Sequence, residues 1–460
     1  MHLQRVRVPN FRVLKDVDIT FEKDYFPRIF PLGSLNGGGK STLLQLIFVL
    51  LHCPFHSKRL PYLKNVLREI GEYSESKVKL LAEINVFDEI QRKNINLEFL
   101  VFQKTDFDRL LDLDIEETQK LYFSNPEGND LERKKEIRQN IQNQQQEIFT
   151  LESSLEVHIG HYYTTSVEKY AQEATESVKS AKESLELFRE KYELLEKITE
   201  ILQKESLTYL CHLLPQSDPE SVLLCRHNLE KDEIESFWDT LSTKTFLAAP
   251  PTQVFLFLPR QSRKTLFKAK SSNNYNSYFS QIESSKLNLP GLFAYDFLAI
   301  ELIINAFRDA RDKDFKQAVK TKGDYGNHYQ NLLNELNPML NNKKINIDPD
   351  LSGVNFTIEN NGEEIDLYPE DLSHGELKRL SIYLWLKFKN IKNSIVLIDE
   401  IETALHPDWQ YQIVRDLEEW EPSNQYILAT HSYELCQALT PAHVKELEPK
   451  LIKQKPDTIS

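Results

Sequence analysis

The sequence has few of the residues that mark several classes of protein. It holds 4 cysteines in 460 residues, which is too few for a disulfide framework. It has no apolar run of the roughly 18 residues or more that a transmembrane helix requires, and its first residues lack the apolar core of a signal peptide. We therefore expect a cytoplasmic protein that does not associate with a membrane.

Basic residues are also fewer than acidic ones, 56 against 70, so the net charge is -14. Such a balance argues against a protein coated in basic surface for nonspecific DNA binding. Two local clusters are basic: residues 260–270, and the set Arg308, Arg311, Lys313, Lys316, Lys320 and Lys322. Each cluster is interpreted either as a patch that contacts nucleic acid or as a solvated helix face.

Glycine is scarce at 13 residues, yet several glycines lie close together in LGSLNGGGKSTLLQLIF, which starts at Leu32. The stretch approximates G-x-x-x-x-G-K-[ST], a loop whose backbone amides cradle phosphates. Ser34 stands where the pattern has its first glycine, whereas Gly39, Lys40 and Ser41 fit the rest. A short apolar strand before the loop and an apolar helix after it supply the context that a phosphate loop needs.

The N-terminal stretch alternates apolar and polar residues in two short runs. These runs predict two strands, over residues 3–8 and 13–21, joined around Pro9-Asn10. Two further strands are predicted to end at Phe87 and Phe102.

The composition changes between residues 131 and 202, where there is no proline and Glu, Lys and Gln are dense. Apolar residues recur at heptad spacing in two arms, from Ile137 to Leu155 and from Ala171 to Leu195, as in a coiled coil. GHYYTTS, which starts at Gly160, fits a reversal between the arms. The pattern predicts an antiparallel helical hairpin, and the alternative is that these helices pack inside a globular helical domain.

A polar motif precedes a predicted helix in DLSHGELKRL. The helix is expected to begin near Gly375, with Ser373 at or near its N-cap. Backbone N–H groups at a helix start attract phosphate. The alternative is a plain N-capped helix, since S-x-x-E is also the pattern of a capping box.

Two apolar strands near the end of the sequence are followed by polar residues. Asp399 and Glu400 follow the first strand, and His431 follows the second. Open α/β sheets bind ligands at the carboxyl ends of their strands, where a carboxylate suits Mg²⁺ and a second carboxylate can polarise an attacking water. A histidine at such a position is more often structural than catalytic when it stands alone.

The order of the four motifs resembles that of ABC-type ATPases: phosphate loop, signature motif (Leu372 to Glu376), acidic strand and switch histidine. The long separation of the first two motifs and the Glu at position 376 resemble the SMC, RecF and OLD group, which acts on DNA, more than transporter ATPases. VPNFRVLKDVDITF and DEIETALHPDWQ resemble the same group. The resemblance implies an α/β fold, an ABC-type ATPase head with a mixed sheet, interrupted by the antiparallel coiled-coil hairpin.

The resemblance also implies a division into four segments. Residues 1–125 would form the N-terminal lobe of the head, and residues 126–210 the hairpin. Residues 211–290 would connect the hairpin back to the head, and residues 291–460 would form the C-terminal lobe with the remaining motifs.

ATP and Mg²⁺ are the ligands that the resemblance implies. Lys40 would hold the β/γ-phosphates, Ser41 and Asp399 the Mg²⁺, Glu400 would be the general base and His431 would contact the γ-phosphate. The nucleotide-binding set would be Arg12, Ser34, Asn36, Gly37, Gly38, Gly39, Lys40, Ser41 and Thr42.

The signature residues would cap the nucleotide of a second copy of the chain. The resemblance assigns this role to four residues of this chain: Ser373, His374, Gly375 and Glu376. A homodimer or a higher even oligomer is therefore implied. The sequence does not identify the glutamine that ABC-type ATPases place near the nucleotide; Gln103 and Gln261 both follow apolar strands, and neither is preferred.

The resemblance narrows further to the stand-alone ATPase subunits of bacterial antiphage systems such as Septu and PARIS. No nuclease motif is found, and the sequence after His431 is too short for a Toprim domain. The leading hypothesis is an ATP-driven sensor or scaffold that controls a separate HNH or Toprim nuclease, with DNA or a phage protein as the trigger. The alternative is a RecF-like DNA repair ATPase that binds DNA in an ATP-dependent way.

One other cluster could ligate zinc: Cys211, His212, Cys225 and His227. The pairs are C-H and C-x-H rather than C-x₂-C, and adjacent residues rarely ligate one ion together. Buried cysteines and surface histidines explain the cluster as well.

Overall fold

The structure is a computed structural model. It describes residues 1–34, 37–68, 78–112, 130–159, 165–213, 220–250, 253, 257–258, 284–285, 287–295, 299–340, 342–347, 354–360, 363–368 and 371–447. The chain divides into two compact units. The first unit contains Met1–Cys53, Ile84–Ile95 and Thr240–Ser460, and the second contains Pro54–Glu83 and Asn96–Asp239.

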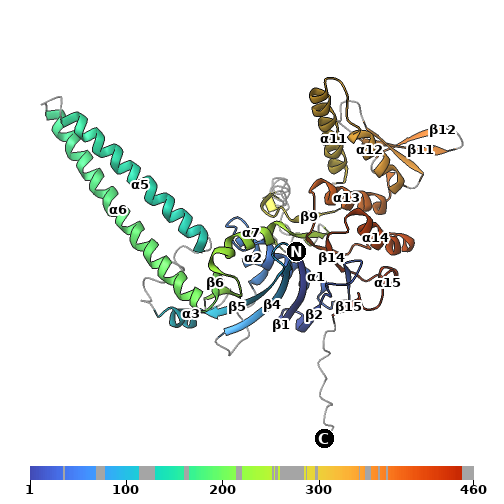
Figure 1. The fold of residues 1–460 in the computed structure, drawn as a ribbon, viewed down its shortest axis with the longest axis horizontal. Coiled ribbons are helices and arrows are strands. Elements are labelled where there is room, and N and C mark those ends of the chain that lie inside the picture. Colours follow the sequence, from blue (N-terminus) through green and yellow to red (C-terminus); the bar gives the residue numbers. More distant parts are fainter. Residues whose placement is uncertain are drawn as a thin grey trace, which may run out of the picture. The chain divides into compact units, whose positions relative to one another are not determined.

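A six-stranded parallel sheet forms the centre of the first unit (Figure 1). Its order is β15 (Lys445–Glu446), β3 (Ile29–Gly33), β14 (Gln425–Ala429), β13 (Ile395–Asp399), β8 (Thr245–Ala249) and β9 (Leu292–Ala294). Every residue of β13 and β14 is buried, as expected of short apolar strands in a parallel sheet that is covered on both faces.

Helices cover both faces of this sheet. Helix α1 (Lys40–His52) packs on β8, β13 and β14. Val396 and Ile398 of β13 belong to an apolar cluster with residues of α11 (Ala299–Thr321), α13 (His374–Phe388) and α14 (Pro407–Trp420). The shorter helices of the unit are α12 (His328–Leu336), η6 (Asn337–Met339) and α15 (Tyr433–Gln437).

A small antiparallel sheet lies in the same unit, in the order β10 (Lys343–Ile347), β11 (Val354–Asn360) and β12 (Glu363–Leu367). Asn360 pairs with Glu363, so β11 and β12 form a hairpin, and residues 361–362 between them lie outside the described part of the chain.

A second six-stranded sheet has the order β2, β1, β4, β5, β7 and β6. The described pairings β1–β2, β5–β7 and β6–β7 are all antiparallel. The bounds are β1 (His2–Phe11), β2 (Leu14–Thr20), β4 (Val78–Asp88), β5 (Lys93–Gln103), β6 (Leu207–Leu213) and β7 (Ser221–His227). The expected mixed sheet is therefore replaced by two separate sheets, one antiparallel and one parallel.

The turn between β1 and β2 differs from the sequence prediction. The turn lies at Arg12-Val13 rather than at Pro9-Asn10, because Phe11 pairs with Leu14 across it. Arg12 adopts a left-handed conformation with φ 53°, which closes a tight two-residue connection.

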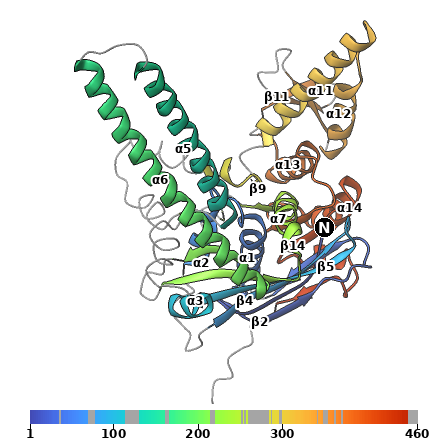
Figure 2. The same cartoon turned by 60° about the vertical axis from the view of Figure 1, so that its left-hand side comes forward.

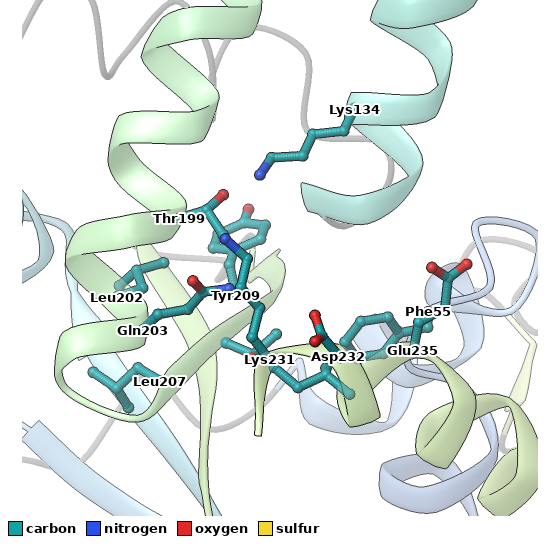
Figure 3. A pocket seen from close by; sticks show the side chains of 12 residues that line it. Phe55, Lys134, Thr199, Leu202, Gln203, Leu207, Tyr209, Lys231, Asp232 and Glu235 are labelled. Atoms are coloured by element: carbon teal, nitrogen blue, oxygen red, sulfur yellow. The ribbon is translucent and has the colours of Figure 1, made fainter. Parts of the chain in front are cut away.

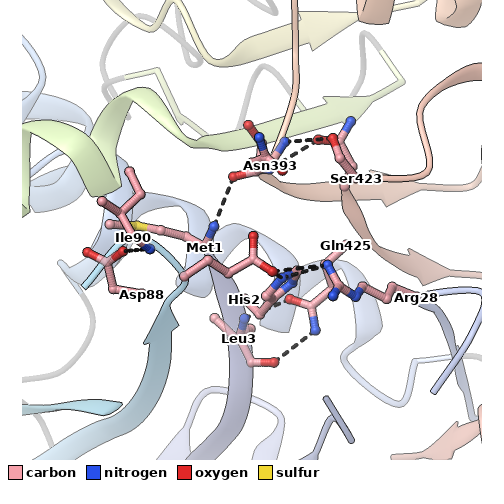
Figure 4. A network of polar contacts seen from close by, with 12 residues as sticks. Met1, His2, Leu3, Arg28, Asp88, Ile90, Asn393, Ser423 and Gln425 are labelled. Atoms are coloured by element: carbon pink, nitrogen blue, oxygen red, sulfur yellow. Dashed lines mark hydrogen bonds and ion pairs between the residues drawn. The ribbon is translucent and has the colours of Figure 1, made fainter. Parts of the chain in front are cut away.

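Buried side chains join β1 to the parallel sheet within the first unit (Figure 4). The amide of Gln425 accepts a hydrogen bond from the backbone nitrogen of Leu3 at 2.7 Å and donates one to its carbonyl at 2.8 Å. The backbone nitrogen of Met1 donates to the carbonyl of Asn393 at 2.9 Å. These contacts satisfy backbone groups that burial would otherwise leave unpaired.

Two long helices of the second unit, α5 (Asp130–Ile159) and α6 (Thr165–Lys204), lie side by side (Figures 1 and 2). Arg138 donates to Tyr192 at 2.7 Å, and Lys182 pairs with Glu152 at 2.7 Å, so the helices run antiparallel. Their packing as a true coiled coil stays a prediction, and the expected reversal at residues 160–164 lies outside the described part. The unit also contains α2 (Leu60–Leu67), α3 (Lys104–Leu111) and η3 (Lys231–Glu233), and α7 (Ile234–Thr243) begins in it.

Candidate functional site

The parallel sheet brings three of the sequence motifs to one edge. β14 lies between β3 and β13 and pairs with both in parallel, so the carboxyl ends of all three strands meet. The glycine-rich loop follows β3, Asp399 ends β13, and His431 comes two residues after β14. This is the edge at which open α/β sheets hold ligands.

Ser41 and Asp399 lie in direct contact. The Ser41 hydroxyl donates a hydrogen bond to Oδ1 of Asp399 at 2.9 Å. Burial raises the pKa of Asp399 to about 6, against the effect of that hydrogen bond, and the charges of Glu400 and Glu402 raise it further. A hydroxyl and a carboxylate at this spacing are the hard oxygen donors that Mg²⁺ prefers.

Lys40 is the buried cation of the site, with an exposed fraction of 5%. Its ammonium donates to the carbonyl and the hydroxyl oxygen of Ser34, both at 3.1 Å, and lies 3.3 Å from Nδ1 of His431. Burial lowers the pKa of Lys40, while the carboxylates of Glu402 and Asp399 oppose that effect. The cation therefore bridges the loop after β3 and the segment after β14.

Glu400 is held in an unusual backbone conformation, with φ 52°. Its N–H donates to the carbonyl of Ala429 at 3.0 Å, and its own carbonyl accepts a hydrogen bond from Lys378 at 2.7 Å. A non-glycine residue in the left-handed region costs free energy, and such strain clusters at functional sites.

The turn that carries Arg12 packs beside the glycine-rich loop. Gly39 has φ 90°, and a Cβ there would lie 2.6 Å from a methyl of Leu14 and 2.9 Å from one of Val13. The chain therefore needs glycine at this position, both for its backbone angle and for this close approach. Gly37 is also left-handed, but it faces open space.

The other residues predicted for nucleotide binding lie in the glycine-rich loop and at the start of α1. Gly38 is buried, Thr42 is half-buried in the first turn of α1, and Asn36 lies outside the described residues.

The signature residues form a second polar cluster at the start of α13. Ser373 is the N-cap, and it forms a capping box with Glu376: the Glu376 N–H donates to the Ser373 hydroxyl at 3.2 Å, and the carboxylate accepts from the Ser373 N–H at 2.9 Å. Lys343 of β10 donates to both carboxylate oxygens of Glu376, at 2.9 and 2.7 Å. Burial opposes ionisation, yet the hydrogen bonds from Lys343 and Ser373 lower the pKa of Glu376. His374 is exposed beside this cluster.

Helix α13 is also fixed against the loop that follows β13. A Cβ on Gly375 would lie 2.7 Å from the carbonyl oxygen of Ala404 and 3.3 Å from the Trp409 ring. Lys378, only 2% exposed, donates to the carbonyls of Glu400 and Thr403. The start of the signature helix and the loop of Glu400 are therefore in contact within one chain.

Sequence reasoning missed Glu402. Its Oε1 accepts a hydrogen bond from the backbone nitrogen of His431 at 2.7 Å, and its Oε2 is buried with no hydrogen-bond partner among the described residues. Its charge acts on both Lys40 and Asp399. Glu402 is the last residue of the DEIE motif, two residues after Glu400. The motif alone does not indicate which group this second glutamate contacts.

Other predicted residues belong to the second unit or lie outside the described structure. Gln103 ends β5 and pairs with Ser221 of β7, whereas Gln261 and the basic cluster 260–270 are outside the described residues. No group of three or more metal-ligating side chains that could hold a metal ion occurs in the described part of the chain.

All four residues considered for zinc lie on the paired strands β6 and β7. The Nε2 of His227 lies 2.8 Å from the Thr208 hydroxyl. Burial raises the pKa of the Cys211 thiol to about 12 and lowers that of His212 to about 4. These surroundings favour a buried thiol and a neutral imidazole in the sheet over a metal site.

The second unit contains a cavity of about 360 Å³ where α5 and α6 approach β6 (Figure 3). Lys134 and Lys231 contribute cations, Asp232 and Glu235 contribute carboxylates, and Tyr209 lies at its wall. None of the residues predicted for nucleotide binding lines this cavity.

Within the described chain, no helix is long and apolar enough to span a membrane.

We expect Ser34→Gly to leave ATP affinity within a few-fold of the original value, because Ser34 lies at the turn directly after β3, where a small residue suffices. Lys40→Ala should abolish detectable ATP binding, since it removes the buried cation that we expect to hold the phosphates. Isothermal titration calorimetry with Mg²⁺ and a nonhydrolysable ATP analogue measures both affinities. Equal losses in the two variants would contradict this account of the loop.

The raised pKa of Asp399 predicts a stability effect. The unfolded carboxyl ionises near 3.8 and the folded one near 6, so its burial destabilises the fold increasingly as the pH rises from 4 to 6 and fully above that. Without Mg²⁺, Asp399→Asn should stabilise the protein at pH 7.5 by up to about 3 kcal/mol, and the gain should shrink toward pH 4.

The melting temperature in EDTA at several pH values tests this prediction. Asp324→Asn, at an exposed position, is the control and should change little at any pH. A gain from Asp399→Asn that does not depend on pH would show that the carboxyl ionises normally in the fold.

The sequence matches the AAA ATPase domain family (AAA_15) over residues 1–436. Retron Vc95 probable ATPase of Vibrio cholerae serotype O1 biovar El Tor is 37% identical over 103 residues, which cover 20% of each chain. Retron Ec83 probable ATPase of Escherichia coli is 47% identical over 45 residues, which cover 10% of this chain and 8% of that protein. The matched segments therefore span 20% or less of the length of these relatives.

Two solved structures are also similar over most of the chain. The Smc head domain with an extended coiled coil, bound to the C-terminal domain of ScpA, from Pyrococcus furiosus is 11% identical with a TM-score of 0.32, covering 95% of this chain and 91% of that one. The Smc head domain with a coiled coil and joint from Pyrococcus yayanosii is 12% identical with a TM-score of 0.32, covering 95% and 94%. TM-scores of this size support no inference about fold or function.

Proposed function

Because the chain belongs to the AAA ATPase domain family, we propose that it binds ATP with Mg²⁺ at the edge of the parallel sheet and hydrolyses it. The observation that carries the proposal is the hydrogen bond between Ser41 and Asp399, which joins the helix after the glycine-rich loop to the acidic strand. The ammonium group of Lys40 interacts electrostatically with the carboxylate of Asp399. A buried cation next to a hydroxyl and a carboxylate suits a nucleotide phosphate with its metal.

We assign the roles residue by residue. Lys40 would exchange its contacts with Ser34 for phosphate oxygens, and the N–H groups at the start of α1 would face the same phosphates. Ser41 and Asp399 would hold Mg²⁺, which neutralises phosphate charge when it is bound. Glu400 would accept a proton from the attacking water. His431, already beside Lys40, would donate to the γ-phosphate.

We propose further that the complete site lies between two copies of the chain. Lys40 contacts Ser34 and His431, whereas Ser373 and Glu376 contact each other and Lys343. The helix start at Ser373 offers backbone N–H groups and a hydroxyl to phosphate, so it suits the nucleotide of a partner copy. One chain would thus contribute to two sites.

Hydrolysis measured against protein concentration tests this proposal. The rate per chain should rise with concentration and level off as the chains pair, and it should require Mg²⁺. A rate per chain that stays constant down to concentrations at which the protein sediments as a monomer would show that one chain suffices.

We propose that this ATPase controls a separate nuclease in antiphage defence. Support comes from the resemblance to antiphage ATPase subunits and from the short matches to two retron ATPases. A pull-down of Glu400→Gln protein with ATP should hold the effector, because hydrolysis would no longer release it. ATP-dependent DNA cleavage by the purified chain alone would oppose a separate effector.

A RecF-like DNA-binding ATPase is the second candidate, and the basic cluster on α11 favours it. Its six cations lie on exposed positions of α11 or just beyond its end. This function predicts ATP-dependent, salt-sensitive DNA binding. Absence of binding at low salt, with or without a nonhydrolysable ATP analogue, would exclude it.

A further inference from the structure

Helix α11 belongs to the first unit of the chain (Figure 2). Its exposed positions carry both basic and aromatic residues. Three of its apolar side chains are unusually open to solvent: Phe315 is 58% exposed, Val319 66% and Tyr325, just after the helix, 67%. We call the α11 surface these three residues together with Arg308, Arg311, Lys313, Lys316, Lys320 and Lys322. Exposed aromatic and branched side chains gathered on one helix mark a surface that contacts another molecule.

The opposite face of α11 holds the helix in place. Phe307 is buried in the core cluster of the unit and packs against Tyr329 with ring centroids 5.0 Å apart. Asp314 accepts hydrogen bonds from the backbone nitrogens of His328 and Tyr329, at 2.8 and 3.0 Å. The exposed face therefore belongs to a helix fixed by its own packing, and its exposure is a property of the folded unit.

Residues 308–325 hold six cations and four carboxylates, so a small cationic excess remains on this surface. Arg311 pairs with Asp312 at 2.9 Å, and Lys313 pairs with Asp309 at 2.6 Å. Among the residues that the structure describes, the ion pairs of α11 involve Arg311, Lys313 and Asp314, and none involves Lys316, Lys320 or Lys322. A cationic excess on a chain of net charge -14 favours a polyanionic partner.

A groove of about 450 Å³ lies on the same surface. Phe315, Tyr325 and Tyr329 line it together with Arg311, Asp312 and Asp314. Both carboxylates are already engaged, Asp314 by the backbone of α12 and Asp312 by Arg311. The groove therefore offers aromatic rings and a guanidinium, which are the groups on which flat, unpaired bases stack.

We propose that the α11 surface binds single-stranded nucleic acid, with bases on Phe315 and Tyr325 and phosphates along Lys316, Lys320 and Lys322. Single strands fit better than duplex because exposed rings reach only bases that are not already stacked in pairs. An acidic protein segment would satisfy the lysines but would leave the rings without a flat partner.

This inference deepens the second candidate function and does not depend on ATP hydrolysis. The surface is built from α11 and the turn after it, whereas the nucleotide site is built at the ends of β3, β13 and β14. A variant that loses nucleic-acid binding but keeps ATPase activity would therefore affect the α11 surface alone. A variant that loses ATPase activity but keeps nucleic-acid binding would affect the nucleotide site alone.

Fluorescence anisotropy with a labelled single-stranded oligodeoxynucleotide of mixed sequence tests the proposal. We expect binding at low salt, and Lys316→Glu/Lys320→Glu should weaken it at least about ten-fold and lower the slope of log affinity against log salt by about 1.4. Phe315→Ala should weaken binding by roughly ten-fold without changing the salt slope. Lys179→Glu/Lys191→Glu on exposed positions of α6 makes the same charge change and should have a much smaller effect.

Two competitors complete the experiment. The matching duplex and poly-glutamate should both compete poorly. Equal binding of duplex, efficient competition by poly-glutamate, or wild-type affinity in the Lys316→Glu/Lys320→Glu protein would each overturn the proposal. If Phe315→Ala lowers the melting temperature, Tyr325→Ala takes its place, because Tyr325 lies outside the helix and is more exposed.

Discussion

Glu400→Gln should lower the rate of ATP hydrolysis by about 10²- to 10⁴-fold and leave ATP affinity nearly unchanged. The substitution keeps the size of the side chain and removes its ability to take a proton from water. The backbone contacts that fix this residue, from Ala429 and Lys378, involve no side-chain atom of Glu400 and should persist. Single-turnover hydrolysis and equilibrium binding, measured on the same preparation, separate the two quantities.

Glu418→Gln is the matched control for this result. Glu418 is exposed on α14 and lies outside the site, so the same chemical change there should leave hydrolysis unaltered. If Glu400→Gln retained most of the activity, the general base would have to be another group of the site. Glu402 would then be the first residue to replace, because its Oε2 has no hydrogen-bond partner among the described residues.

Gly375→Ala should destabilise the protein by about 1–3 kcal/mol and also reduce hydrolysis. Alanine is the better helix former, by about 1 kcal/mol, but its Cβ would lie 2.7 Å from the carbonyl oxygen of Ala404. A backbone oxygen cannot rotate away as a side chain can. The loop between β13 and α14 must therefore shift, and that loop begins at Glu400.

Thermal unfolding without nucleotide measures the stability part of this prediction. His374→Ala is the control, because His374 is exposed in the same helical turn and its truncation should cost little. A stable Gly375→Ala protein that fails only in hydrolysis would assign Gly375 to the nucleotide of a partner copy alone. A destabilised protein supports the packing role that the geometry gives it.

The central part of the site could be anticipated from the sequence because it depends on strand order and polarity. Short apolar strands such as that of Ile395 to Ile398 belong in a covered parallel sheet, and parallel strands gather their carboxyl ends at one edge. Lys40, Ser41 and Asp399 therefore had to lie near each other once β3 and β13 joined the sheet on either side of β14. The capping box of Ser373 and Glu376 was also readable, because it depends on residues three apart.

The sequence could not indicate contacts between residues that lie about thirty positions apart in the chain. Glu402 contacts the backbone of His431, and Lys343 contacts Glu376, across separations that no periodic pattern encodes. The turn at Arg12-Val13 was misplaced because the left-handed conformation falls on an arginine, whereas Pro9-Asn10 carries the usual turn residues. The division into two sheets depends on strand pairing, which residue alternation does not specify.

We propose that one chain supplies the phosphate loop and a second chain supplies the signature residues of the same site. The most direct test mixes two inactive variants, Lys40→Ala and Ser373→Arg. In a mixed dimer, Lys40 and Ser373 are both intact at one of the two sites, so an equal mixture should recover roughly one quarter of the original hydrolysis rate. No recovery, in a mixture shown to form mixed dimers, would contradict the claim and place the complete site within one chain.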